Sequence, residues 1–91
     1  MSLRLVHTFG RNAGAAFAPA GDVVRFGRAP DNDVVFDAEY DRDASGYHAE
    51  LRRAGDAWVL VDLGSRNGTF LCGRRVAREA ISNGDEIGFG G

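Results

Sequence analysis

Residues 58–76 read WVLVDLGSRNGTFLCGRRV. The apolar run at residues 58–63 is the strongest strand signal of the chain. A loop is predicted at Gly64 to Gly68, a second strand at residues 69–71, and a turn at Gly73-Arg74-Arg75 that leads into Val76. Two apolar runs separated by a short Gly-rich loop indicate β-structure here.

Short apolar runs and turn residues alternate in the same way along the rest of the chain. Strands are predicted at residues 4–9, 13–18, 23–26, 34–36, 47–52 and around Glu86-Ile87, with a polar surface loop from Asp37 to Gly46. Residues 78–81 have room for one helical turn at most. No segment has helical periodicity over the ~11 residues of an average helix. We therefore expect an all-β sandwich of about ten to eleven short strands.

The 91 residues fit one small domain, and their composition limits the functions that this domain can have. The formal net charge is -2, so generic binding of nucleic acid is not expected. All 11 basic residues are Arg, which is typical of a GC-rich bacterial source, and the planar Arg fork suits phosphate. Cys72 is the only cysteine, which excludes cysteine zinc sites and fits the cytoplasm. No membrane-spanning run, metal site or cofactor is expected.

Several residues are candidates for a functional site, but each of them, taken alone, is explained equally well by a structural or solvent-exposed role. Arg28 is typical of a solvated side chain at a strand end. Ser45 and His48 form a weak nucleophile-and-base pattern, without the G-x-S-x-G sequence of a hydrolase, so no enzyme is expected. Asn67-Gly68 is a common turn pair. The acidic residues between 37 and 43 lack the glycine and the final glutamate of a calcium loop.

The order of these elements is more specific than any one of them. FGRAPDNDVVF at residues 26–36 is followed by SGYHAEL at 45–51, DLGSRNGTF at 62–70 and NGDEIGFG at 83–90. Together they strongly resemble the forkhead-associated (FHA) family, over a motif-bearing core at residues 23–89 of a single domain at 1–91. The resemblance implies an FHA/SMAD-like β-sandwich that binds a phosphothreonine segment of another protein. Such a module serves signalling or regulation and catalyses no reaction.

The resemblance also implies roles for individual residues. Arg28 would contact the phosphate, Ser45 would donate its hydroxyl to a phosphate oxygen, and Asn67 would bond the peptide backbone. Charge-assisted bonds of this kind contribute roughly 1.5–3 kcal/mol each. Three residues would be structural: Gly27 by allowing a tight turn, His48 by tying neighbouring loops together, and Gly68.

This chain departs from the family pattern beside Ser45. The following residue is often basic in the family and is Gly46 here, while Asp43 places a negative charge nearby. Arg42 and Arg66 are the nearest residues that can compensate. The alternative function is therefore a phosphate-independent interaction scaffold with the same fold.

Two further departures affect the strands. The turn that usually reads Asn-Gly is Cys72-Gly73 here, and the sequence stops at Gly91, before the final strand of the family. A missing last strand would leave an open sheet edge. We therefore expect either a segment of a larger protein or pairing with a second copy of the chain through that edge.

Overall fold

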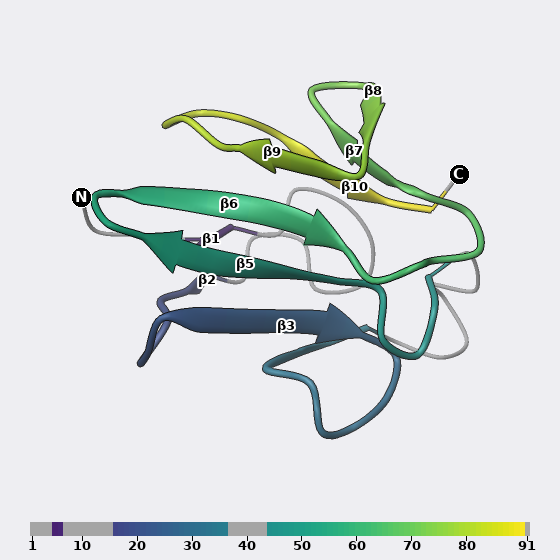
Figure 1. The fold of residues 1–91 in the computed structure, drawn as a ribbon. Coiled ribbons are helices and arrows are strands. Elements are labelled where there is room, and N and C mark those ends of the chain that lie inside the picture. The colour runs from purple at the N-terminus through teal and green to yellow at the C-terminus, as the bar shows by residue number, and fades with distance from the viewer. Residues whose placement is uncertain (1–4, 7–15, 37–43, 91) are drawn as a thin grey trace.

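The computed structural model describes residues 5–6, 16–36 and 44–90. In this part of the chain the structure is all-β and contains no helix (Figure 1). Its strands are β1 (Leu5–Val6), β2 (Ala16–Phe17), β3 (Val23–Gly27), β4 (Val34–Val35), β5 (Ala49–Ala54), β6 (Ala57–Asp62), β7 (Thr69–Leu71), β8 (Arg74–Val76), β9 (Arg78–Ala80) and β10 (Ile87–Phe89).

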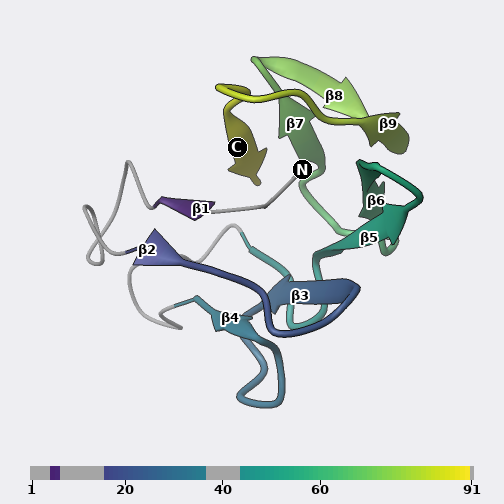
Figure 2. The same ribbon diagram turned by 90° about the vertical axis from the view of Figure 1, so that its left-hand side faces the viewer.

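The larger sheet has five strands in the order β4-β3-β5-β6-β9. The pairs β3–β5, β5–β6 and β6–β9 are antiparallel, whereas β4 runs parallel to the end of β3. A second sheet has the order β10-β7-β8, and β1 pairs with β2 in a separate ribbon. Both views place β7, β8 and β10 on one side of β3 and β5, as the two layers of a sandwich (Figures 1 and 2). The expected fold class is confirmed.

The core lies between these layers because side chains alternate between the two faces of each strand. Val24 and Phe26 of β3 point inward, and they meet Leu51 of β5, Leu60 of β6 and Leu71 of β7. All five side chains are buried.

Aromatic rings extend this core towards one end of the sandwich. Phe89 stacks on Phe26 with 4.9 Å between ring centroids and lies at the same distance from Phe36. His48 meets the edge of Phe89 at 5.4 Å. These rings connect the two sheets directly beneath the loops that follow β3 and precede β5.

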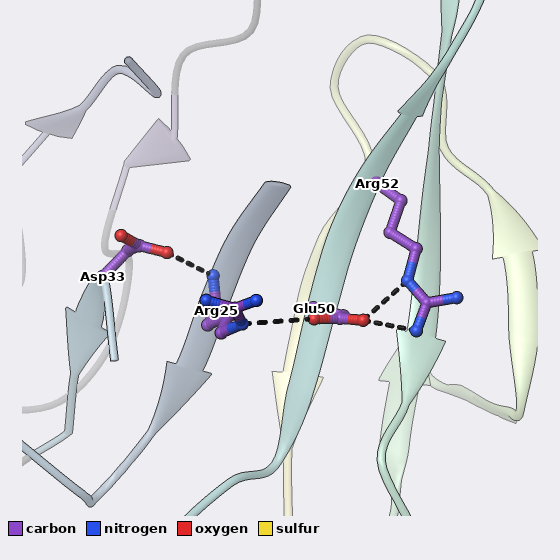
Figure 3. A network of polar contacts seen from close by, with 4 residues as sticks. All are labelled: Arg25, Asp33, Glu50 and Arg52. Carbon is purple, nitrogen blue, oxygen red and sulfur yellow. Dashed lines mark hydrogen bonds and ion pairs between the residues drawn. The ribbon is translucent and has the colours of Figure 1, made fainter. Parts of the chain in front are cut away.

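The outer face of the five-stranded sheet carries a charged network (Figure 3). Arg25 and Glu50 are opposite each other in the β3–β5 register, so their side chains are direct neighbours. The buried Glu50 carboxylate pairs with Arg25 at 3.6 Å and accepts a hydrogen bond from Arg52 Nε at 2.6 Å. Asp33 accepts a bond from the Arg25 amide at 2.8 Å. The network therefore fastens the end of the 28–33 loop to β3.

The antiparallel arrangement brings three loops to one end of the molecule. The end of β3, the start of β5 and the end of β6 lie at the same end of the sheet (Figure 1). The segments 28–33, 44–48 and 63–68 adjoin these strand ends, so residues far apart in sequence meet there.

Several predicted elements differ from the observed ones. Residues 78–81 were expected to hold at most a helical turn, but Arg78–Ala80 form β9, because their backbone pairs with β6. The turn lies at residues 72–73, where the family pattern places it, and not at residues 73–75, since Arg74 already pairs with β7. Tyr47 precedes β5 and is not part of it.

The amino-terminal predictions are only partly covered by the described residues. Of the strands expected at 4–9 and 13–18, the structure describes β1 and β2, and the intervening turn lies outside the described residues. The open edge expected from a missing last strand stays a prediction. None of the described residues forms a helix long and apolar enough to cross a membrane.

Candidate functional site

The 28–33 loop is held against the 44–48 segment by backbone hydrogen bonds. The amides of Arg28 and Ala29 donate to the carbonyls of Ser45 and Gly46, at 3.1 and 3.0 Å. A Cβ added to Gly27 would lie 2.0 Å from the Gly46 carbonyl oxygen. Gly27 is therefore required by the close approach of two backbones. The prediction that Gly27 allows a tight turn is wrong, because Gly27 is the last residue of β3 and has no positive φ.

Two side chains close this pair of loops further. The buried Asn32 donates through Nδ2 to the carbonyls of Ala29 and Gly46, both at 2.8 Å. On the exposed side, the Tyr47 hydroxyl donates to the Asp31 carboxylate at 2.9 and 3.0 Å. This hydrogen bond and the negative charge of Asp31 raise the pKa of Tyr47 above its ordinary value. Arg28 is thus displayed on a loop fixed from both sides.

His48 connects the 44–48 segment to the 63–68 loop. Its side chain is 0% exposed. Nδ1 accepts a hydrogen bond from the Ser45 amide at 3.0 Å, so the ring proton lies on Nε2, which donates to the Gly68 carbonyl at 2.6 Å. Both ring nitrogens are therefore engaged by the backbone. A hydrolytic role would need His48 to take the proton of the Ser45 hydroxyl, and this arrangement disfavours it.

The 63–68 loop is organised by the carboxylate of Asp62. Its oxygens accept bonds from the amides of Gly64 and Ser65, at 3.0 and 3.1 Å, and from the hydroxyls of Ser65 and Thr69. Partial burial by itself raises the pKa of Asp62, but these four hydrogen bonds outweigh it and lower the pKa below its ordinary value. Ser65 Oγ in turn accepts a bond from the Gly68 amide at 3.0 Å.

Ser45 joins the two halves of this surface. Its carbonyl accepts the bond from the Arg28 amide, and its hydroxyl oxygen accepts one from the Arg66 amide at 3.1 Å. A hydroxyl that accepts a bond through its oxygen keeps its proton for donation to another group. Ser45 therefore contacts the main chain of Arg28 through its carbonyl and the main chain of Arg66 through its hydroxyl, which remains a donor.

The remaining predicted site residues are placed as follows. Asn67 adjoins Arg66 in the 63–68 loop, and Gly68 has a φ of 93°, a left-handed conformation that favours glycine. Arg42 and Asp43 lie outside the described residues.

Within residues 5–6, 16–36 and 44–90, the arginines of this surface have no acidic partner. Neither Arg28 nor Arg66 forms a salt bridge with any described residue. Arg28 Nε is buried and donates no hydrogen bond within the described ranges. The guanidinium groups of these two arginines and the Ser45 hydroxyl offer several donors to an anion with several oxygens, such as a phosphate. No group of three His, Cys, Asp or Glu residues in the described part is placed to hold a metal ion.

Sequence reasoning missed three residues that shape the site. Asp62 precedes Gly64 and Ser65 at the spacing of an Asx-turn, and this local signal could have identified it. Asn32 acts through Gly46, fourteen positions away, and Arg75 contacts Gly68 only because β7 and β8 pair. No local pattern predicts those two contacts.

Comparison with known proteins identifies the class to which this fold and site belong. The model of the FHA domain family matches residues 24–90, and the chain belongs to this family. Among solved structures, an Arabidopsis thaliana FHA domain has a TM-score of 0.87 and 32% identity, covering 99% of this chain and 78% of its own. An FHA domain from a study of phosphothreonine-dependent FHA interactions has a TM-score of 0.86 and 28% identity, covering 99% and 88%.

Curated bacterial relatives are similar along nearly the whole sequence. The oxoglutarate dehydrogenase inhibitor of Corynebacterium jeikeium is 42% identical over 98% of this chain. The glycogen accumulation regulator GarA of Mycolicibacterium smegmatis is 38% identical over 98%. The chain spans 60% and 54% of the length of these two relatives. By their names, both relatives regulate metabolism.

Proposed function

We propose that this chain is a phosphothreonine-dependent protein-binding module of a bacterial signalling or regulatory protein. The observation that carries the proposal is the position of Ser45, whose carbonyl and hydroxyl bond the amides of Arg28 and Arg66. One phosphate placed at the Ser45 hydroxyl would lie between two arginines that have no acidic partner among the described residues.

The chemistry of the ligand matches these groups. A phosphothreonine carries about -1.5 to -2 charges at pH 7 and three strong acceptor oxygens. In this proposal Arg28 and Arg66 provide charge-assisted bonds, the Ser45 hydroxyl provides a neutral one, and Asn67 bonds the peptide backbone. Two or three such bonds predict a dissociation constant on the order of micromolar.

The comparisons support the same proposal. Besides the phosphothreonine study, one similar structure is Mycobacterium tuberculosis EmbR in complex with a low affinity phosphopeptide, with 30% identity and a TM-score of 0.77. It covers 84% of this chain and 20% of its own. We further propose that the module has no catalytic activity of its own, acts in the cytoplasm, and binds a Thr-phosphorylated protein, not nucleic acid or a membrane.

The proposal is tested by titrating the protein with three versions of each member of a peptide library, carrying phosphothreonine, phosphoserine or threonine. We expect micromolar binding of phosphothreonine peptides and at least tenfold weaker binding of the others. Arg28→Gln should abolish binding. Arg53→Gln is the matched control, because Arg53 lies in β5 beside Asp22, away from the three loops. Equal affinity for phosphorylated and unphosphorylated peptides, or retained binding in Arg28→Gln, would contradict the proposal.

Gly46 favours a second candidate, a phosphate-independent scaffold. A Cβ added to Gly46 would meet no atom within 4 Å, and this position after Ser45 has no basic side chain, unlike the family pattern given above. A scaffold of this kind would ignore the whole phosphopeptide library and still bind a protein partner. Binding of that partner should then be the same in wild type and in Arg28→Gln.

A further inference from the structure

Arg75 lies against the loop that carries Asn67. A Cβ added to Gly68 would be 2.7 Å from Arg75 Nε and 2.9 Å from Arg75 Cζ. The guanidinium group therefore occupies the space that any other residue at position 68 would fill. Its contact depends on the strand register, because Arg75 is opposite Phe70 and Gly68 is the next residue on the same face of the chain.

This position places Arg75 at the border of the candidate site. Gly68 directly follows Asn67, and its carbonyl is bonded by His48, whose other ring nitrogen bonds Ser45. A single imidazole ring thus separates the Ser45 backbone from the backbone that Arg75 covers. A peptide held at Ser45 and crossing Asn67 would reach Arg75 next.

The charge of Arg75 is not neutralised within the described residues. It forms no salt bridge there, whereas Arg25 and Arg52 share Glu50, and Arg53 pairs with Asp22. The residue is exposed, and its guanidinium lies close to the Gly68 backbone. An exposed guanidinium without an acidic partner among the described residues is available to bond a carboxylate.

We propose that Arg75 forms a second anion-binding subsite, which selects phosphothreonine peptides that carry an acidic residue close to the phosphothreonine. The inference rests on the proposed function and deepens it by naming the class of peptide. Arg28, Ser45 and Arg66 would hold the phosphate, and Arg75 would bond one carboxylate farther along the same peptide. The carboxylate contributes affinity only when its position along the peptide matches Arg75.

Arg74 provides a matched control on the same strand. It adjoins Arg75 but points to the opposite face of β8, since neighbouring side chains alternate. Both arginines are exposed, so Gln at either position removes one positive charge without disturbing the core.

The test measures fluorescence anisotropy with one set of phosphothreonine peptides. Each peptide has neutral residues around the phosphothreonine except for a single Glu, which is moved through the four positions on either side. For the wild type we expect one position, or two neighbouring ones, to strengthen binding about three- to tenfold over the all-neutral peptide. The gain should vanish in Arg75→Gln, persist in Arg74→Gln, and shrink at high salt.

The outcomes separate this inference from the proposed function. Binding of the all-neutral phosphopeptide with no gain at any Glu position would overturn the subsite alone, as would an undiminished gain in Arg75→Gln. Absence of phosphopeptide binding by the wild type would overturn both. The affinity of Arg75→Gln for the all-neutral phosphopeptide should match the wild type, which shows that the variant is folded, and a large loss there would also contradict a separate subsite.

Discussion

Gly27 and Gly46 approach so closely that a Cβ on Gly27 would lie 2.0 Å from the carbonyl oxygen of Gly46. Real side chains do not make such contacts, so a substitution at Gly27 must push the two loops apart. The same movement would displace Ser45, whose carbonyl is bonded by the Arg28 amide. The pair therefore links the stability of the fold to the geometry of the candidate site.

Gly27→Ala should destabilise the protein by about 1–3 kcal/mol, because the added methyl group overpacks the contact between two backbones. It should also weaken phosphopeptide binding. Urea denaturation and anisotropy measure the two effects. Gly46→Ala is the control, since no atom lies within 4 Å of its Cβ, and it should change stability by less than about 0.5 kcal/mol. A Gly27→Ala protein as stable as Gly46→Ala would refute the contact.

Gly46→Arg should strengthen phosphopeptide binding about three- to tenfold. The position adjoins Ser45 and has open space, so the new guanidinium can add a charge-assisted bond to the phosphate. Calorimetric titration of Gly46→Arg and Gly46→Ala with one phosphopeptide compares charge with bulk. An increase in both variants, or in neither, would show that the missing basic residue is not what limits affinity.

Asp62→Asn should lower the free energy of unfolding at pH 7 by about 1 kcal/mol, because an amide cannot accept all four hydrogen bonds that the carboxylate accepts. The pKa of Asp62 is lower in the folded protein than its ordinary value of 3.8. The ionised carboxylate therefore stabilises the fold above that value, and this contribution is lost as pH falls through the folded pKa.

The difference between wild type and Asp62→Asn should consequently shrink when thermal unfolding is measured at pH 3 instead of pH 7. Asp56→Asn serves as the control, because Asp56 is an exposed residue of the β5–β6 turn. A difference for Asp62→Asn that is the same at both pH values would contradict the role given to its charge.

Cys72→Asn should stabilise the protein by about 0.5–1 kcal/mol. Cys72 has a φ of 50° and Gly73 one of 83°, as in the type I′ turn for which Asn-Gly is the preferred pair. Asn adopts the left-handed conformation at lower cost than Cys. Thermal unfolding of Cys72→Asn and Cys72→Ser separates the backbone effect from loss of the thiol. Equal melting temperatures for both variants would argue against strain at this turn.

The sequence predicts the strands well where burial alternates, as in β3 and β6. It fails at β9, whose three residues are all exposed and which forms because its backbone pairs with β6. Pairing of this kind leaves no trace in the pattern of hydrophobic residues. Turn residues alone predict the turn one residue late, at 73–75, because Cys is unusual at a positive φ, whereas the family pattern places it at Cys72-Gly73.

The sequence likewise predicts part of the candidate site and misses the contacts that depend on the fold. The family motifs point to Arg28 and Ser45, and the structure places their main chains in contact. The contacts of Asn32 and Arg75 arise from residues that meet only after the sheets have formed. A motif specifies residue types along a chain, whereas these contacts depend on strand register.

The single ring proton of His48 makes the assembly of the site observable by NMR. With Nδ1 accepting from Ser45 and Nε2 donating to Gly68, the imidazole is held in one tautomer, and its two nitrogens should give well-separated ¹⁵N resonances. Since the side chain is fully buried, its Nε2 proton should exchange slowly with solvent. One signal inside the protein thus reports whether the two loops on either side of the ring remain joined.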